Sequence, residues 1–239
     1  MGQVPAFNAA PIGIVGDGRV ARHFHHYLSL LGLPVRSWSR RIPGAGPVRT
    51  LDSCRTILLL IADSAIVPFI EEWAPWPDKR LIHFSGSLVT KAAEGAHPLM
   101  TFGHALYDLA TYRSIPFVLD AGATPFHELL PALPNPSFTI PSSDRPYYHA
   151  LCVLAGNCST LLWLKLFDEL RNRWRIPASA AHPYLARATA NLMTDPGGAF
   201  TGPLARGDAE TIAANLKALD RDPFHGVYAA FVRAHAHRS

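Results

Sequence analysis

A glycine-rich turn near the start of the chain, Gly16-Asp17-Gly18-Arg19-Val20-Ala21, constrains the fold more than any other feature. The apolar segment Ile12–Val15 precedes it, and apolar residues at helical spacing follow it. This order predicts a buried strand, a tight turn and a helix, the arrangement that binds a dinucleotide. Gly16 allows the turn, Gly18 lets the backbone approach a phosphate, and Ala21 keeps the helix close to the sheet. The helix N-terminus would bind the pyrophosphate. The alternative is a glycine turn that binds nothing.

Further apolar segments follow in the first half of the chain. Pro34–Trp38, Thr56–Ala62, Arg80–Phe84 and Ile115–Leu119 each predict a strand. The second of these is apolar throughout, as expected for a parallel strand covered on both faces. Asp63 is expected to cap the helix that follows it. Because strands alternate with helices, we predict an α/β fold with a doubly wound parallel sheet.

From Ser142 onward, the sequence pattern is that of helices and no longer of alternating strands and helices. Asp144 can cap a helix whose apolar stripe continues from Leu151 to Trp174. This pattern predicts one helix about 45 Å long at about 1.5 Å per residue. Three shorter helices are expected after it: around Ala180 to Met193, from Asp208 to Leu219, and from Pro223 onward. We therefore predict a Rossmann-type domain over residues 1–141 and an all-helical domain over residues 142–239.

The end of the second predicted strand, Ser39-Arg40-Arg41, indicates which dinucleotide binds. NAD sites place Asp or Glu there to bind the ribose 2′-hydroxyl, whereas NADP sites accommodate a 2′-phosphate. No acidic residue occurs from Gly18 to Leu51, and six arginines do. Arg40 and Arg41, with the Ser39 hydroxyl, are suited to a phosphate, and Ala62 is expected to complete the cofactor-binding set. The alternative is that both arginines are simply solvated.

Composition limits the remaining possibilities. The 239 residues are 49% hydrophobic and 17% charged, enough to bury a large core. The net charge of +4 comes from scattered arginines and not from a basic patch, which disfavours nucleic-acid binding. No unbroken apolar run exceeds six residues, the length of Ile57–Ala62, which is too short to cross a membrane. Three cysteines without metal-ligand spacing and an N-terminus without a secretion signal favour free thiols, no metal and a cytoplasmic location.

These features together resemble a known family. The glycine turn, His83-Phe84-Ser85-Gly86-Ser87, Ala96-His97-Pro98-Leu99, Ala155-Gly156-Asn157 and above all Thr201-Gly202-Pro203-Leu204-Ala205-Arg206-Gly207-Asp208 resemble bacterial proteins with a Rossmann-like domain followed by the domain DUF2520. Their architecture is similar to that of 6-phosphogluconate dehydrogenase, pyrroline-carboxylate reductase and ketopantoate reductase. The resemblance implies an NADPH-dependent reduction of C=O or C=N.

One departure from that group bears on the chemistry. Its hydroxyacid dehydrogenases and ketopantoate reductases carry a catalytic Lys four residues before an Asn on the first long helix of the second domain. Asn157 matches the Asn, but Val153 stands at the Lys position. Lys165, two turns further along, is the candidate substitute. Asn157 lies on the apolar stripe of the helix, so its amide is expected to face packed or cleft surface, where it either orients a substrate or ties elements together.

Other polar residues are candidates for binding the substrate. His97, expected just past a strand and helix at the rim of the cofactor site, either supplies the proton that the reduction needs or simply bonds to the backbone. Ser85, Gly86 and Ser87 are expected at the carboxyl end of a strand, where their hydroxyl and N–H groups suit a substrate carboxylate or form an ordinary turn. Thr201 and Arg206 are candidate substrate anchors.

The sequence therefore predicts an NADPH-dependent reductase of a small oxo or imino acid, with ketopantoate as the first substrate to test. Because Val153 replaces the usual Lys, a non-catalytic NADP-binding sensor or assembly protein is the alternative. The long helix has more apolar surface than three short helices can cover. We therefore expect a homodimer through the helical domain.

Overall fold

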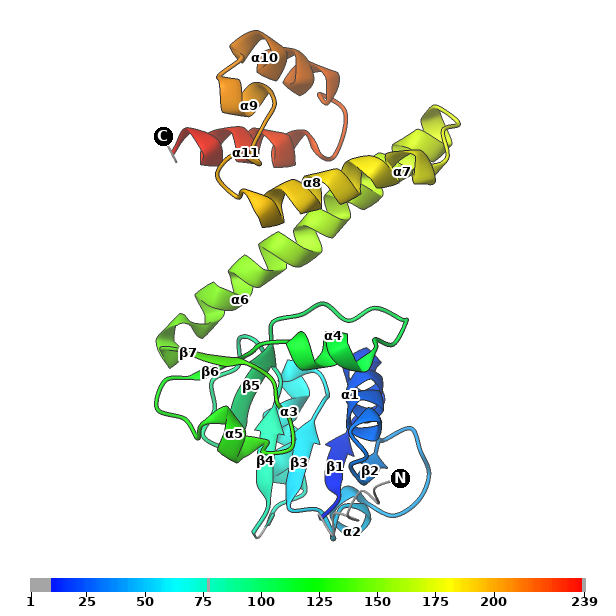
Figure 1. Cartoon of the computed structure of the whole chain (residues 1–239), viewed down its shortest axis with the longest axis vertical. Helices are drawn as coiled ribbons and strands as arrows, with labels where there is room; N and C mark the ends of the chain where they lie inside the picture. Colours follow the sequence, from blue (N-terminus) through cyan, green and yellow to red (C-terminus); the bar gives the residue numbers. More distant parts are fainter. Residues whose placement is uncertain (1–9, 77, 238–239) are drawn as a thin grey trace, which may run out of the picture. The chain divides into compact units, whose positions relative to one another are not determined.

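The computed structural model describes residues 10–76 and 78–237, so the predicted absence of an N-terminal signal lies outside the described residues. The chain divides into two compact units, Met1–Ser159 and Thr160–Ser239. The first is an α/β unit and the second is helical (Figure 1). This division falls inside a long helix over residues 142–173, whereas the sequence pattern alone predicts a boundary near residue 141.

A seven-stranded sheet forms the centre of the α/β unit, with the strand order β2-β1-β3-β4-β5-β6-β7. All neighbouring strands are parallel except β5 and β6, which are antiparallel. The predicted doubly wound α/β class is therefore confirmed, with one reversed strand pair. The strands are β1 (Ile12–Val15), β2 (Val35–Trp38), β3 (Thr56–Leu59), β4 (Arg80–His83), β5 (Glu94–Pro98), β6 (Phe117–Asp120) and β7 (Ser137–Ile140).

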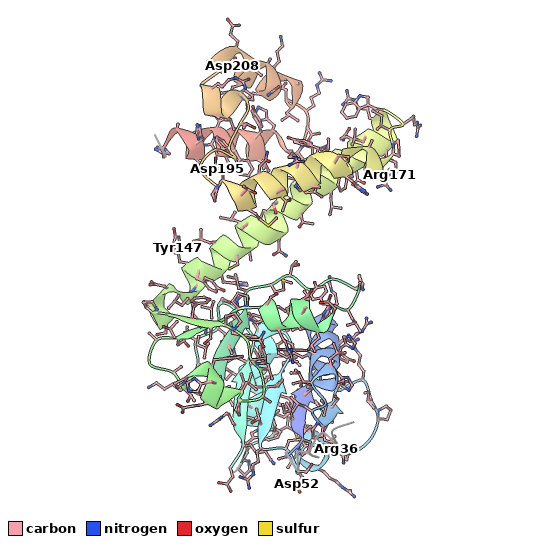
Figure 2. All side chains as sticks on the ribbon, viewed as in Figure 1. Arg36, Asp52, Tyr147, Arg171, Asp195 and Asp208 are labelled. Carbon is pink, nitrogen blue, oxygen red and sulfur yellow. The ribbon has the colours of Figure 1, made fainter. Side chains whose placement is uncertain are left out.

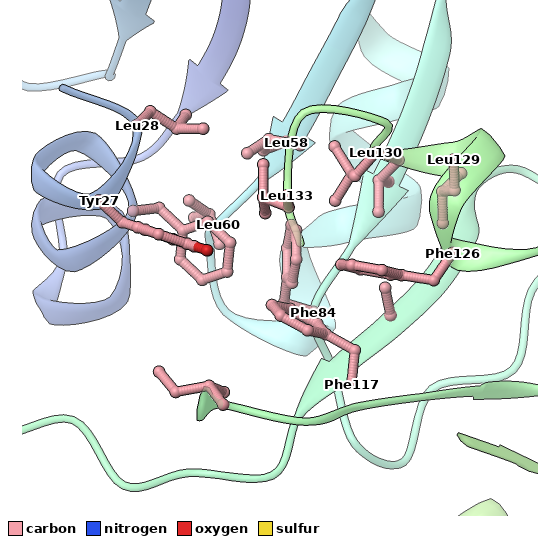
Figure 3. Packing of buried hydrophobic residues seen from close by; sticks show 14 of the residues in the cluster. Tyr27, Leu28, Leu58, Leu60, Phe84, Phe117, Phe126, Leu129, Leu130 and Leu133 are labelled. Carbon is pink, nitrogen blue, oxygen red and sulfur yellow. The ribbon is translucent and has the colours of Figure 1, made fainter. Parts of the chain in front are cut away.

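Alternate residues of the central strands enter two apolar layers, one on each face of the sheet. Ile14 and Leu58 pack in one layer with Phe24 of α1 (Arg19–Leu30), and the same layer holds residues of α4 (Leu109–Ser114) and α5 (Phe126–Leu129). Figure 3 shows part of this layer, where Tyr27, Phe84, Phe117 and Phe126 come together. Residues of α3 (Asp63–Glu72) pack in the opposite layer, and the short helix α2 (Pro47–Thr50) precedes β3.

Several details of the α/β unit differ from the sequence prediction. The segment between β4 and β5 contains no helix, and His97 lies inside strand β5 rather than after a helix. Strand β7 and helices α2, α4 and α5, each four to six residues long, were not predicted. Asp63 is the first residue of α3 and not its cap, because Ala62 holds the cap position and makes no side-chain hydrogen bond. Short segments carry too few residues to show a hydrophobic period.

The long helix begins with a 3₁₀ turn, η1 (Ser142–Asp144), and continues through α6 (Arg145–Val153), η2 (Leu154–Cys158) and α7 (Ser159–Arg173). The predicted long helix is therefore present. The segment η2 is a π-helical turn, a feature that is uncommon and often found at functional sites.

The helical unit contains the rest of α7 and shorter helices in the order η3 (Ala178–Ala181), α8 (His182–Thr194), α9 (Pro203–Arg206), α10 (Ala209–Ala218) and α11 (His225–Ala236). Asp208 caps α10 as predicted, since its carboxylate accepts a bond from the Thr211 N–H at 3.0 Å. Helix α9 was not predicted. It ends at Gly207, whose φ of +64° favours glycine.

Large apolar side chains remain exposed along the long helix and on α8. From Thr160 onward, only Ala181 among the described residues is buried. Tyr147 is 70% exposed and projects from α6 in Figure 2. Ser142–Arg173 is also long and apolar enough to cross a membrane, with a mean hydropathy of 1.6 in its most apolar window. The predicted absence of a membrane span, which rested on unbroken apolar runs, stays a prediction.

Candidate functional site

A pocket of about 700 Å³ opens beside the glycine turn of the α/β unit. Its walls come from the ends of β1, β2 and β3, from the first turn of α1, from α3 and from the residues that follow β4. All nine residues predicted from the sequence to bind a cofactor line this pocket, namely Gly16, Asp17, Gly18, Arg19, Val20, Ser39, Arg40, Arg41 and Ala62. The fold therefore brings together residues that are up to 46 positions apart in the sequence.

The glycine turn has the backbone that a bound phosphate requires. Gly16 has a φ of +123°, and a Cβ there would collide with the carbonyl oxygen of Leu60, so only glycine fits. Gly18 occupies the cap position of α1 without a side-chain hydrogen bond, and a Cβ there would meet no atom within 4 Å. The first turn of α1 carries no acidic residue. Its backbone N–H groups and positive dipole end are therefore suited to an anion.

Ser39 and the two arginines line this pocket just after β2, where a ribose 2′-phosphate would be expected. The Ser39 hydroxyl is buried and donates to the Asp17 carboxylate at 3.2 Å. The Arg41 guanidinium lies 3.7 Å from the same carboxylate, and its side chain is 83% exposed. Asp17, itself one of the predicted cofactor-binding residues, precedes the acid-free interval, so its charge did not enter the prediction drawn from that interval. Its carboxylate contacts two of the groups expected to bind phosphate.

An aromatic wall forms part of the pocket and was missed by the sequence analysis. Trp38 lies with its ring centroid 5.7 Å from that of Phe69 and 6.1 Å from that of Trp73. These side chains come from β2 and from the end of α3, which are distant in the sequence. Flat aromatic surfaces of this kind can stack on a purine base.

The serines after β4 differ from expectation. The Ser85 hydroxyl donates to the Asp63 carboxylate at 2.5 Å, and the Ser87 hydroxyl lies 3.4 Å from the same oxygen. The Ser85 oxygen also accepts the Leu88 N–H at 2.9 Å. Both hydroxyls therefore face a carboxylate of the protein, which would repel a substrate carboxylate at the same place. The structure thus favours the alternative in which this segment is an ordered turn.

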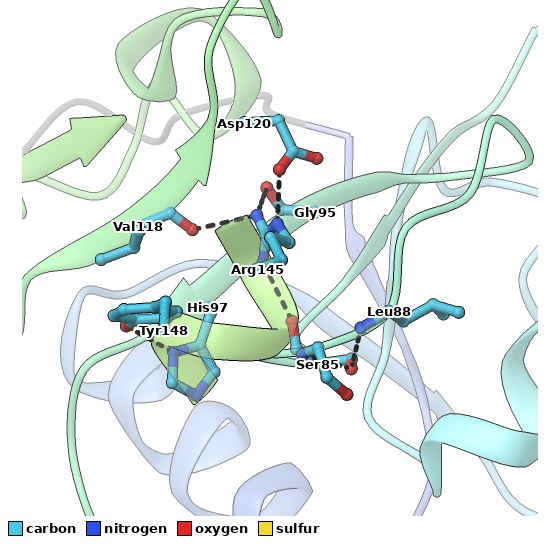
Figure 4. Close-up of polar contacts among 9 residues, drawn as sticks. Ser85, Leu88, Gly95, His97, Val118, Asp120, Arg145 and Tyr148 are labelled. Atoms are coloured by element: carbon cyan, nitrogen blue, oxygen red, sulfur yellow. Dashed lines mark hydrogen bonds and ion pairs between the residues drawn. The ribbon is translucent and has the colours of Figure 1, made fainter. Parts of the chain in front are cut away.

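Arg145, which no sequence argument singled out, fixes the start of α6 to the sheet. Its side chain is fully buried, and its Nε lies 2.5 Å from the Asp120 carboxylate. Its other nitrogens donate to the carbonyl oxygens of Ser85, Gly95 and Val118 at 3.2 to 3.4 Å (Figure 4). One guanidinium therefore joins the segments of β4, β5 and β6 to the helix, a role for which its five rigid N–H donors are suited.

His97 on β5 contacts two residues of α6. Its Nδ1 lies 2.9 Å from the Tyr148 hydroxyl (Figure 4), and its ring centroid lies 5.6 Å from those of both Tyr148 and His149. Burial, followed by the neighbouring His149 and Arg145, lowers the pKa of His97 from 6.5 to about 4. The imidazole is therefore neutral at physiological pH. It can donate one N–H bond but does not carry the extra proton of an imidazolium.

His83 is a second neutral imidazole in the same region. Burial, with a smaller contribution from Arg145, lowers its pKa from 6.5 to about 4. Its Nδ1 is buried and has no hydrogen-bond partner. A buried polar atom without a partner costs free energy. The burial of the His83 Nδ1 therefore lowers the stability of the folded protein.

The other predicted catalytic residues lie in different surroundings. Asn157 lies in the π turn and is exposed, which corrects the expectation of a packed or cleft-facing amide. Lys165, on α7, pairs with Asp222 at 2.6 Å and Glu169 at 2.7 Å, and hydrogen bonds to these carboxylates raise the pKa of Lys165. This geometry favours a structural role for Lys165. Thr201 and Arg206 are exposed in the helical unit.

No metal site is apparent in the part of the chain that the structure describes, since no three His, Cys, Asp or Glu side chains are grouped to hold an ion. All three cysteines, Cys54, Cys152 and Cys158, are free.

Comparison with known proteins agrees with this fold. The family model described as a domain of unknown function, DUF2520, matches residues 117–235. Among curated proteins, none matches the sequence. The structure of BF3122 from Bacteroides fragilis, described as an NADP oxidoreductase, has a TM-score of 0.74 at 20% identity over 95% of this chain and 97% of that one.

Two further solved structures share the fold at lower identity. Protein TM1727 from Thermotoga maritima has a TM-score of 0.67 at 17% identity, over 95% of this chain and 97% of that one. A reductive aminase from Aspergillus terreus, in complex with NADPH and ethyl levulinate, has a TM-score of 0.59 at 14% identity, over 96% of this chain and 88% of that one. The Rossmann-like fold with helices after it is therefore shared with these proteins.

Proposed function

Residues 117–235 of this chain belong to the DUF2520 family and follow a Rossmann-like nucleotide pocket, and on that premise we propose that the protein is an NADPH-dependent reductase of small compounds with a C=O or C=N bond. The observation that carries the proposal is the pocket itself. It combines a glycine turn, an uncapped helix N-terminus and the residues Ser39-Arg40-Arg41. The names of two structural neighbours, an NADP oxidoreductase and a reductive aminase with NADPH, support it.

The residues that line the pocket have separate parts in this proposal. The N–H groups at the start of α1 would hold the pyrophosphate, and Gly18 would let it approach. Arg40 and Arg41 would bind the 2′-phosphate through charge-assisted hydrogen bonds. When bound, NADPH supplies a hydride. The aromatic wall at Trp38 would exclude water from the base.

The electrostatics next to Ser85 bear on the substrate. A small oxo or imino acid remains the proposed substrate class, with ketopantoate as the first oxo acid to test. However, the Asp63 carboxylate, which lines the pocket and accepts from Ser85, favours a neutral or cationic group at that place. An imine, which gains positive charge when protonated, suits this position better than a carboxylate. A substrate carboxylate would have to bind elsewhere, and Arg206 remains a candidate for it.

A glycine substitution tests the cofactor site without disturbing the fold. Gly18→Val adds a side chain where a Cβ meets no protein atom within 4 Å, but where it would obstruct a bound pyrophosphate. We expect an unchanged melting temperature without cofactor and at least about tenfold weaker NADPH binding by calorimetry, a loss of about 1.4 kcal/mol. Gly103→Val is the matched control, since Gly103 also has open space and does not line the pocket. Equal NADPH affinity in both variants would remove the pocket from the proposal.

Turnover separates the reductase from the alternative, a non-catalytic NADP-binding sensor or assembly protein. Val153 at the position of the usual Lys favours that alternative. The test is consumption of NADPH with a panel of 2-oxo acids, including ketopantoate, and cyclic imines. Turnover of any member supports the reductase. Tight NADPH binding without turnover across the panel supports the sensor.

We also propose that the protein is a cytoplasmic homodimer that associates through its helical unit. A unit in which Ala181 is the one buried residue among those described has no apolar core of its own, and a second copy would cover the exposed apolar side chains. Free cysteines are typical of a reducing compartment. Light scattering should give twice the chain mass of 26.1 kDa. A mass of one chain throughout a micromolar dilution series would contradict the dimer.

A further inference from the structure

We propose that Tyr148 is the proton donor of the reduction and that His97 positions the Tyr148 hydroxyl and returns its proton. The assignment rests on the proposed reductase function, and it adds a residue that the sequence argument did not consider. From the sequence alone, His97 either supplies the proton itself or only bonds to the backbone.

The contact between the two side chains is the first observation. Tyr148 lies on α6 and His97 on β5, and the phenol oxygen is 2.9 Å from the imidazole Nδ1. The rings meet edge to face, at 83° and 5.6 Å between centroids. Arg145, three residues before Tyr148, fixes this end of α6 to the sheet through its pair with Asp120. The phenol is therefore held by a rigid support, as a proton donor must be.

His149 connects this pair to the nucleotide pocket. A Cβ on Gly86 would collide with the His149 imidazole, so His149 lies directly against the backbone that follows Ser85. Ser85 lines the pocket. The ring centroids of His97 and His149 are 5.6 Å apart. The Nδ1 of His149 is buried and has no hydrogen-bond partner. Contacts between neighbouring groups therefore lead from the pocket to Tyr148.

The pKa shifts of His97 and Tyr148 indicate which of the two side chains holds a proton at neutral pH. Burial lowers the pKa of His97 to about 4, so imidazolium is scarce at neutral pH. Burial and the neighbouring Cys152 thiol raise the pKa of the Tyr148 phenol, so that the phenol keeps its proton. Among these two side chains, only the phenol O–H and a single imidazole N–H are available to a substrate.

In the proposed step, Tyr148 gives one proton and His97 returns it. Bound NADPH would supply a hydride to the carbon of the C=N or C=O bond. As the π bond breaks, the nitrogen or oxygen would take the Tyr148 O–H proton. The phenolate oxygen then accepts the proton of His97 Nδ1 while His97 Nε2 takes a proton from water. His97 passes from one neutral tautomer to the other without becoming charged, and exchange with solvent restores the first tautomer. The net consumption is one hydride and one solvent proton.

Two substrates that differ in their need for a proton test the assignment. A neutral cyclic imine, assayed above the pKa of its conjugate acid, needs hydride and proton, whereas its N-methylated iminium salt needs hydride alone. We expect Tyr148→Phe to lower turnover of the imine by about 10² or more, the usual contribution of a general acid, and to leave turnover of the iminium salt within about threefold. Tyr147→Phe is the matched control, because Tyr147 is 70% exposed.

Other results of this comparison would contradict the role of Tyr148. Equal losses on both substrates, or no loss on either, would overturn the role of Tyr148. If the unmodified protein turns over neither substrate and none of the 2-oxo acids, the proposed reductase is overturned, and the assignment with it. A separate readout is the ¹⁵N NMR spectrum of labelled histidine. We expect the His97 Nδ1 to carry the proton, so that the phenol O–H is free to face the substrate. A bare Nδ1 would show that Tyr148 donates into His97, which contradicts the relay.

Discussion

Acid should destabilise this protein through its buried neutral histidines, and His83 allows the size of the effect to be worked out. Its pKa is lowered from 6.5 to about 4 in the folded protein. As the pH falls from 6.5 towards 4, the unfolded chain binds a proton on this group and the folded protein does not. Stability is therefore unaffected above pH 6.5 and decreases below it. At about 1.4 kcal/mol for each pH unit, the full loss from His83 is about 3 kcal/mol.

The charges around His83 agree with this direction. Arg145 disfavours the protonated imidazole, whereas Asp63 and Asp120 favour it and only partly offset burial. His83→Asn removes the titration, so the free energy of unfolding should decrease less steeply between pH 6 and 4.5, by about 1.4 kcal/mol for each unit.

Urea denaturation at several pH values measures the slope, and a constant stability offset in the variant does not affect it. His25→Asn is the control, because His25 is exposed. We expect this variant to show the same dependence of stability on pH as the unmodified protein. An unchanged slope in His83→Asn would refute the argument.

The remaining predictions concern cofactor choice, the buried ion pair and the long helix. Changing Arg40 and Arg41 to Ala should weaken NADPH binding by about 2 to 4 kcal/mol and leave NADH binding nearly unchanged. Calorimetric titration of both cofactors measures this, and equal losses for the two would contradict the preference for NADP. Arg145→Met should lower the free energy of unfolding by about 3 kcal/mol, because Asp120 loses its partner; denaturation at neutral pH measures it. Asn157→Ala should leave the melting temperature unchanged, since Asn157 is exposed, and should lower turnover about 10² if the amide binds substrate; unaltered kinetics would exclude that role.

The strands and helices with a strong local pattern were predictable. The strand before Gly16, the helix after it and the apolar β3 each have a period or an unbroken apolar run that identifies them. Strand β5 has no such pattern, because Glu94–Pro98 contains a glycine and a proline and gains its place only by pairing with β4 and β6. Its antiparallel pairing depends on long-range contacts that no local window contains.

The candidate site was predictable where one motif determines one backbone shape, as at the cofactor turn. The partners of charged groups were not, because Asp63 and Ser85 or Arg145 and Asp120 meet only in the folded chain. The count from Val153 to Asn157 also assumed a regular helix. Between them lies a π turn, whose hydrogen bonds span five residues rather than four. Cys152 therefore lies about one turn before Asn157.

The buried guanidinium of Arg145 has a practical consequence for cutting the protein into parts. A fragment that ended at residue 141 would lose Arg145 and leave the Asp120 carboxylate and the carbonyl oxygens of Ser85, Gly95 and Val118 without this donor. It would also expose the surface that His149 covers at Gly86. We expect such a fragment to aggregate when expressed alone. Isolation of the α/β portion for spectroscopy should keep the chain at least to Ser159, so that the first half of the long helix accompanies the sheet it stabilises.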